Sequence, residues 1–256
     1  MWHRIAPRMA QRFSLVMPDL RGYGQSSAPR NDPKNEAYSK RTMASDMVAV
    51  MAALGHRRFS IAGHDRGGRV AYRMALDHSD RVTRLCVLDI VPTFTMWRSM
   101  SAAAAMKIYH WPFLAQPYPL PERLISADPA FYVDWTIASW TRDKNLAAFD
   151  PAALAAYRNA MSEPERLHAA CNDYRAGATI DLAHDEQDHA ASHMIDCPTL
   201  ALWGNSGIPG GTTSPLKVWR EWCAEVEGFG IDAGHFIAEE NPDATAAALL
   251  RFLDSE

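Results

Sequence analysis

Short runs of apolar residues recur along the chain at intervals typical of buried strands. They lie at 13–19, 59–62, 82–88, 198–203 and 229–231. Runs of this length with little polar alternation are typical of strands that are covered on both faces. We therefore expect these five segments to form a mostly parallel sheet.

Between these runs, apolar residues repeat at helical spacing. Met43, Met47 and Met51 recur every fourth residue within 38–54, which predicts a helix there. Further helices are expected at three places: over 2–11, over 65–77 and from 241 onward. This alternation of strand and helix predicts an α/β fold with helices on both faces of the sheet.

The alternation stops between 93 and 180. This region is helical in pattern and rich in Trp, Tyr, Met and Ala. We interpret it as a helical cap, inserted over the carboxyl ends of the strands, where such folds hold their chemistry. The predicted domains are therefore an α/β core, residues 1–92 and 181–256, and a cap, residues 93–180.

One stretch predicts the chemistry most directly. Residues 63–67 read Gly-His-Asp-Arg-Gly between a predicted strand and a predicted helix. This frame is a nucleophile elbow, with Gly63 and Gly67 bracketing a turn too tight for side chains and Asp65 at its centre. A carboxylate is suited to displacing a leaving group from saturated carbon, which leaves an ester for water to cleave. The alternative is a glycine-rich turn with a capping Asp.

Two more residues follow strand ends in the order that an elbow nucleophile requires. Asp89 follows the 82–88 run, and His235 follows the 229–231 run. The order nucleophile, acid, histidine suits a base that activates water and an acid that orients it. Asp89 could instead cap a turn, and His235 could be structural. The loop after 198–203 offers no nearby carboxylate, which favours Asp89 as the acid.

Two arginines follow the nucleophile at once. Arg66 and Arg69 lie in the first turn of the expected helix, where cations oppose the helix dipole. Paired guanidinium groups in that position favour a carboxylate ligand, so we expect a small carboxylic acid as substrate. Salt bridges to surface acids are the alternative. In the cap, three donors could receive a departing anion, although each alone is more often a packed aromatic: His110, Trp111 and Tyr174.

Composition narrows the classes of protein to which the chain could belong. The chain has 256 residues and a net charge of −4, which gives no electrostatic case for nucleic acid or an anionic membrane. Its four cysteines are scattered without a CxxC pair, which fits a reducing compartment better than a disulfide or zinc framework. No apolar run reaches the roughly 18 residues of a membrane span. We expect a cytoplasmic enzyme.

The motifs together resemble the fluoroacetate dehalogenases over nearly the whole chain. The resemblance rests on Asp-Leu-Arg-Gly-Tyr-Gly, Gly-His-Asp-Arg-Gly-Gly-Arg, Leu-Asp-Ile-Val-Pro-Thr, Tyr-His-Trp-Pro-Phe-Leu-Ala-Gln-Pro, Asp-Tyr-Arg-Ala and Gly-His-Phe, at 19–24, 63–69, 88–93, 109–117, 173–176 and 234–236. It implies an α/β-hydrolase fold and hydrolysis of a haloacetate to glycolate and halide. It also implies a homodimer and no cofactor.

Carried over by position, the resemblance gives each candidate residue a role. Asp65 is the nucleophile, with His235 as base and Asp89 as its acid. Arg66 and Arg69 bind the substrate carboxylate, and a halide pocket is implied at His110, Trp111 and Tyr174. Two other functions stay open: epoxide hydrolysis by the same set, with Tyr109 and Tyr174 as proton donors, and a truncated binding remnant without activity.

One feature departs from the family. The family begins with further residues that hold its first strands and a loop donating a backbone N–H beside the nucleophile. One of those strands lies between the 13–18 and 59–62 strands, so we expect a gap in the middle of this sheet, with unpaired backbone groups.

Overall fold

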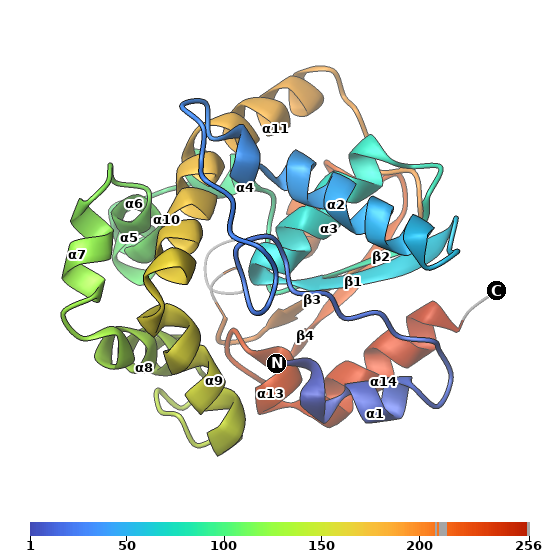
Figure 1. The fold of residues 1–256 in the computed structure, drawn as a ribbon. Coiled ribbons are helices and arrows are strands. Elements are labelled where there is room, and N and C mark those ends of the chain that lie inside the picture. Colours follow the sequence, from blue (N-terminus) through green and yellow to red (C-terminus); the bar gives the residue numbers. More distant parts are fainter. Residues whose placement is uncertain (208, 210–213, 255–256) are drawn as a thin grey trace.

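A four-stranded parallel sheet forms the centre of the molecule. In the computed structural model, which describes residues 1–207, 209 and 214–254, the strands are β1 (Phe59–His64), β2 (Val82–Leu88), β3 (Thr199–Gly204) and β4 (Val226–Ile231). They lie in the order β1-β2-β3-β4, and all three pairs are parallel (Figure 1). Four of the five predicted strands are therefore confirmed.

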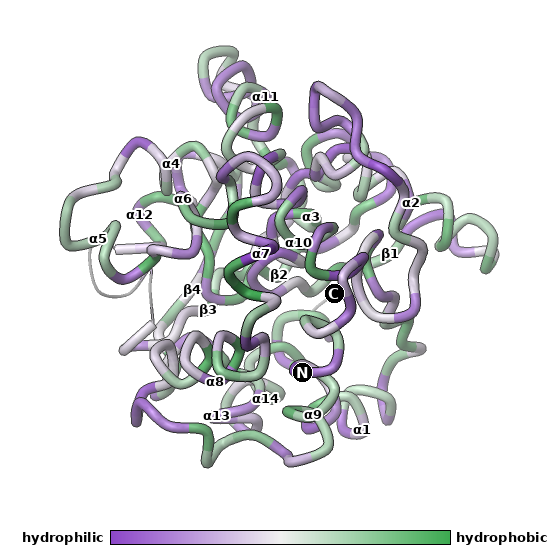
Figure 2. The backbone as a smooth tube through the Cα atoms, turned by 60° about the vertical axis from the view of Figure 1, so that its left-hand side comes forward, coloured by the Kyte–Doolittle hydropathy of each residue, from purple (hydrophilic) through white to green (hydrophobic). Residues whose placement is uncertain are grey.

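Helices cover both faces of this sheet, as predicted. One layer contains α2 (Lys40–Ala53), α3 (Asp65–Asp77) and α12 (Pro215–Trp219), and the other contains α1 (Ala6–Met9), α13 (Ile237–Glu240) and α14 (Pro242–Leu253) (Figure 1). Two short 3-10 helices, η1 (Trp2–Arg4) and η2 (Glu36–Tyr38), precede α1 and α2. Along the helices, hydrophobic and hydrophilic positions alternate (Figure 2).

Strand β2 shows why the apolar runs are nearly continuous. Leu85 and Val87 pack into the core on the α2 and α3 side, whereas Cys86 and Leu88 pack into the core on the α1 and α14 side. Because successive side chains point to opposite faces and both faces are covered at Leu85–Leu88, all four of these positions are apolar, whereas the less buried Thr83 and Arg84 are polar.

Eight helices lie between β2 and β3. They are α4 (Thr93–Arg98), α5 (Ala102–Lys107), α6 (His110–Leu114), α7 (Leu120–Ile125), α8 (Pro129–Trp140), α9 (Pro151–Ser162), α10 (Pro164–Ala178) and α11 (Ile180–Ala190). They gather on one side of the sheet (Figure 1). The helical pattern predicted for 93–180 is confirmed, and one further helix, α11, follows it. No helix of the described residues is long and apolar enough to cross a membrane.

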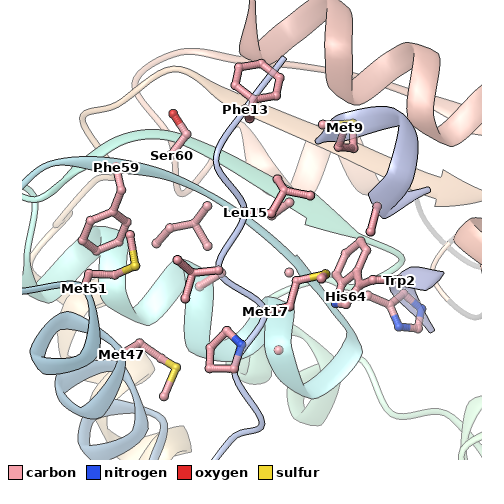
Figure 3. Close-up of a pocket in the computed structure, with 18 of the residues that line it drawn as sticks. Trp2, Met9, Phe13, Leu15, Met17, Met47, Met51, Phe59, Ser60 and His64 are labelled. Carbon is pink, nitrogen blue, oxygen red and sulfur yellow. The ribbon is translucent and has the colours of Figure 1, made fainter. Parts of the chain in front are cut away.

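The prediction of a strand over residues 13–19 is wrong. Residues 14–20 have no regular structure, and no backbone hydrogen bond joins them to β1 within the described part of the chain. A strand needs a neighbour about 4.8 Å away to pair with. Here a largely apolar cavity of about 480 Å³ lies between this segment and β1 (Figure 3).

This cavity agrees with the gap expected beside residues 59–62. It is lined by the 13–18 segment, by β1 and by side chains of the helices on both faces, among them Met47, Met51 and Met9 (Figure 3). Met17 is 58% exposed, although its sequence run predicts burial. The β1 edge is therefore unpaired on this side in the described structure.

Candidate active site

The candidate nucleophile and acid follow neighbouring strands at the same level. His64, the last residue of β1, pairs in register with Leu88, the last residue of β2, so Asp65 and Asp89 each come one residue later. Both have positive φ, 46° and 50°, a conformation that non-glycine residues seldom adopt. Local strain of this kind is concentrated at functional sites, where the surrounding structure holds it.

The glycines of the elbow correct one detail of the prediction. A Cβ on Gly63 would lie 2.5 Å from the carbonyl oxygen of Gly67, and a Cβ on Gly68 would lie 2.9 Å from that of Gly63. A Cβ on Gly67 would meet nothing within 4 Å. The turn therefore requires glycine at 63 and 68, where strand and helix approach each other most closely, and not at 67.

His235 joins the two carboxylates. Its Nδ1 lies 2.6 Å from Oδ2 of Asp89, and its Nε2 lies 3.9 Å from Oδ2 of Asp65. The other oxygen of Asp89 accepts a 2.8 Å hydrogen bond from the backbone N–H of Gly204. A Cβ on Gly207 would lie 2.4 Å from Asp89 Oδ1, so the loop after β3 leaves room for this carboxylate. The structure thus brings the predicted acid and base into contact.

These contacts shift the protonation of the whole group. Burial alone would lower the pKa of His235, but its contacts with Asp65 and Asp89 raise it to about 10. Burial would raise the pKa of Asp65, and His235 holds it well below its usual range. For Asp89, burial outweighs His235, and its pKa is raised. In the free protein at neutral pH, His235 is therefore a cation beside the carboxylate of Asp65.

The His235 loop is held by residues that the sequence did not single out. Glu240 accepts hydrogen bonds from the backbone N–H groups of Gly234, Phe236 and Arg142. The N–H of His235 donates to the carbonyl oxygen of Trp140, at the end of α8. Glu240 lies only five residues from His235, but nothing in its spacing indicates that it accepts from these backbone groups.

His64 is a second histidine at the elbow, and it is neutral. Burial, aided by the charge of His235, lowers its pKa to about 3. Its Nε2 donates a 2.8 Å hydrogen bond to the carbonyl oxygen of His235. The two rings lie 4.4 Å apart, so His64 supports the loop that holds the base.

Arg66 and Arg69 are both buried, 8% and 3% exposed, which excludes the alternative of surface salt bridges. Arg66 has an acidic partner all the same. Its Nε and Nη2 donate to the two carboxylate oxygens of Asp173 in α10, at 2.8 and 2.7 Å. Most of the charge of Arg66 is therefore compensated within the protein.

Arg69 differs from Arg66 because it touches only neutral acceptors. Its Nη1 donates to the carbonyl oxygen of Val91 and to Oγ1 of Thr93, at 2.9 and 3.3 Å. Its Nε is buried without a hydrogen-bond partner, and no ion pair is formed by Arg69 among the described residues. Burial, followed by the nearby charge of Arg66, lowers the pKa of Arg69. A buried cation left in this state is costly unless an anion joins it.

The aromatic residues of the helical insertion lie above the nucleophile. His110, Trp111 and Trp140 line one cavity together with Asp65 and His235. The ring of His110 lies 5.6 Å from that of Tyr174, and the ring of Trp111 lies 6.2 Å from it. The predicted His110, Trp111 and Tyr174 are therefore brought together.

Trp140 is an addition to the predicted set. Its indole N–H is buried and has no hydrogen-bond partner among the residues that the structure describes, and its ring centre is 4.3 Å from that of His110. Burial lowers the pKa of His110 to about 3, so this imidazole is neutral. The cavity has a volume of only about 10 Å³, and Arg69 also lines it. Space of that size holds about one water molecule.

The described residues contain no group of three or more His, Cys, Asp or Glu side chains placed to hold a metal ion. The side chains at this site supply a candidate carboxylate nucleophile, a histidine between two carboxylates, a guanidinium without an ion-pair partner in the described part of the chain, and several N–H donors.

A family model described as the alpha/beta hydrolase fold matches residues 1–242. The chain belongs to the alpha/beta hydrolase family. A solved structure of a proposed alpha/beta hydrolase from Nostoc sp PCC 7120 agrees with this, with a TM-score of 0.95 and 48% identity over 98% of this chain and 85% of that one.

Two curated relatives of this alpha/beta hydrolase differ in function. It is 41% identical to a fluoroacetate dehalogenase from Burkholderia sp, over 99% of this chain and 82% of the relative. It is 30% identical to a soluble epoxide hydrolase from Corynebacterium sp. (strain C12), over 98% of this chain and 84% of the relative. The comparisons therefore identify a hydrolase. They do not decide between these two reactions, so the choice of one of them must rest on the residues of the site.

Proposed function

We propose that this alpha/beta hydrolase cleaves the carbon–halogen bond of a short 2-haloacid, converting a haloacetate to glycolate and halide. One observation supports this above the others: Arg69 is a buried guanidinium without an acidic partner among the described residues, and it lines the same cavity as Asp65. A substrate carboxylate would supply the missing anion and hold its α-carbon close to the nucleophile.

The first step is displacement by Asp65. One carboxylate oxygen attacks the carbon that bears the halogen, a carbon–oxygen bond forms as the carbon–halogen bond breaks, and the electron pair leaves with the halide. The lowered pKa of Asp65 keeps it anionic and ready to attack. Neutral His110, Trp111 and Tyr174 would stabilise the departing halide by donating to it. We assign residues 93–180 the role of a cap that supplies these donors.

The second step is hydrolysis of the ester, and it needs a neutral His235. In the free protein, Asp65 and Asp89 both raise the pKa of His235. Once Asp65 is a neutral ester, only Asp89 still does so, and the pKa of His235 falls. His235 can then take a proton from water as the water attacks the ester carbonyl, and it returns that proton to glycolate as the ester bond breaks. Alkylation itself thus prepares the base.

Epoxide hydrolysis is the second candidate, because the same Asp, His and Asp would serve it and one relative has that name. It needs donors that protonate the epoxide oxygen. Tyr109 shares a 2.9 Å hydrogen bond with Oγ1 of Thr136 instead, and neither Tyr109 nor Tyr174 is among the residues that line the cavity. A neutral epoxide would also leave Arg69 without an anion. Both points favour the haloacid.

The test compares the two substrates on one preparation. Fluoride and chloride release from fluoroacetate and chloroacetate is measured with ion-selective electrodes, and diol formation from propylene oxide is measured in parallel. We expect halide release and little diol, with halide release abolished by Asp65→Asn. Diol formation without halide release would reject the haloacid in favour of the epoxide. Halide release by Asp65→Asn, with deamidation excluded, would reject Asp65 as nucleophile.

A further inference from the structure

Asp173 is a buried carboxylate that accepts hydrogen bonds from three other side chains. Its side chain is fully buried, and it accepts from Arg66 through two N–H groups, from Nζ of Lys40, and from the phenol of Tyr23 at 2.6 Å. Its backbone carbonyl accepts a third hydrogen bond from Arg66, at 2.9 Å. Asp173 lies in α10, one residue before Tyr174, whereas its partners come from α3, α2 and the loop before η2. One side chain therefore fixes α10 to three other elements.

The contacts with Asp173 also fix which part of Arg66 remains available. Nε and Nη2 are used by Asp173, and Nη1 has no hydrogen-bond partner within the described residues. The guanidinium carbon lies 4.3 Å from the ring centre of Tyr174 and 5.9 Å from that of Trp111. Arg66 is thus held on two sides, and Nη1 is the guanidinium nitrogen that Asp173 does not use. Arg66 does not itself line the cavity of Asp65 and Arg69, but it lies against Trp111, which does.

The charges of this cluster balance without a ligand. Lys40 also contacts Asp181, through Nζ at 3.3 Å and through its backbone N–H at 2.7 Å. Two cations, Arg66 and Lys40, are therefore matched by two carboxylates, Asp173 and Asp181. Arg66 adds little net charge to the site, in contrast to Arg69.

We infer that Asp173 is a positioning residue for substrate binding: it holds Arg66 so that Nη1 meets the substrate carboxylate, while Arg69 supplies the charge. This inference rests on the proposed function, because it requires a carboxylate in the site. Arg66 would orient the substrate carboxylate, whereas Arg69 would supply the positive charge that attracts it.

Asp173→Asn tests this role because the loss of its charge and the loss of its hold on Arg66 should change anion affinity in opposite directions. Asp173→Asn removes a negative charge, which by itself makes the site more positive and tightens the binding of an anion. The same change breaks the paired contact that orients Arg66. Misplacing a substrate-binding group by about 1 Å can cost on the order of 100-fold in rate. We therefore expect weaker binding of glycolate and a lower kcat/KM for chloroacetate, by roughly 10- to 100-fold.

Two controls separate the alternatives. Asp181→Asn removes a carboxylate from the same Lys40 without touching Arg66, and it should leave glycolate affinity unchanged or tighter. Lys40→Met, added to Asp173→Asn, restores the charge balance but not the acceptor of Arg66, so it should not rescue binding. Affinity for glycolate is measured by calorimetry and folding by urea denaturation. Rescue by Lys40→Met, or an unchanged or tighter affinity in Asp173→Asn, would overturn the inference.

The experiment also covers a variant that does not fold and a wild-type protein without the proposed activity. If Asp173→Asn does not fold, Tyr23→Phe removes one uncharged contact from Asp173, and a several-fold loss of glycolate affinity is expected; no loss would overturn the inference. If the wild-type protein binds glycolate but releases no halide, the proposed reaction fails while the affinity measurements still test Asp173. If it binds no glycolate, the inference fails with the proposed function.

Discussion

Replacing each arginine in turn by methionine should have clearly unequal effects on stability. Arg66→Met and Arg69→Met remove the same charged group from two buried positions three residues apart on α3. The surroundings differ in one respect: Arg66 pairs with Asp173, whereas Arg69 donates only to the neutral oxygens of Val91 and Thr93.

The expected magnitudes follow from these partners. Arg66→Met leaves the buried Asp173 without its main counter-charge, and breaking a buried pair in this way costs about 3–5 kcal/mol. Arg69→Met gives up hydrogen bonds worth roughly 1–3 kcal/mol. It gives up a contact with the Trp111 ring, 4.4 Å from the guanidinium carbon, worth about 0.5–2 kcal/mol. It also removes a buried cation that has no ion-pair partner among the described residues, and the desolvation of such a cation costs several kcal/mol. The losses and the gain nearly cancel, so we expect Arg69→Met to unfold within about 1 kcal/mol of wild type, or to be more stable.

Urea denaturation followed by tryptophan fluorescence gives the free energies of unfolding, and calorimetry gives the affinity for glycolate. A domain of this size changes its Tm by roughly 2–4 °C per kcal/mol, so Arg66→Met should lose on the order of 6–20 °C. Arg69→Met should weaken glycolate binding by about 2–5 kcal/mol, or roughly 30- to 5,000-fold. Equal destabilisation by both variants would refute the reasoning, because it would mean that Arg69 is as well compensated as Arg66.

Two other predictions concern the triad and the elbow. The pKa of His235 is raised above its unfolded value, to about 10, so its contribution to stability is complete below pH 6.5 and is lost as pH rises through 10. The free energy of unfolding should therefore fall between pH 7 and pH 10, by at most about 1.4 kcal/mol per pH unit. His235→Asn should lack most of this fall. An identical slope in the variant would contradict the raised pKa of His235. Gly63→Ala should cost about 1–3 kcal/mol because its Cβ meets the backbone at 2.5 Å, whereas Gly67→Ala should cost nothing or stabilise the helix by up to about 1 kcal/mol, as urea titrations of the pair would show.

The sequence predicted which side chains lie together better than it predicted their surroundings. Asp65, Asp89 and His235 follow strand ends, and parallel strands bring their carboxyl ends to one edge, so order alone was enough to place them together. The paired glycines were assigned less well. The requirement at 68 and not at 67 depends on how closely the helix approaches the strand, which the motif does not contain.

Two predictions needed the third dimension. Arg66 and Arg69 look equivalent in sequence, and only the fold shows that Asp173, more than a hundred residues away, compensates one of them. The 13–19 run has the composition of a buried strand, but a strand requires a neighbour as well as a suitable sequence. Beside a cavity of about 480 Å³ it has none, and its apolar side chains are partly exposed.

The covalent intermediate offers the most direct test of the central claim, that Asp65 is alkylated by a haloacid and that His235 hydrolyses the product. The His235→Gln variant is incubated with chloroacetate, digested, and its peptides are analysed by mass spectrometry. The account predicts one equivalent of chloride per protein and a carboxymethyl group on Asp65, stable in the variant and absent from the wild type after turnover. An unmodified Asp65 in a folded variant whose wild-type parent releases chloride would contradict it.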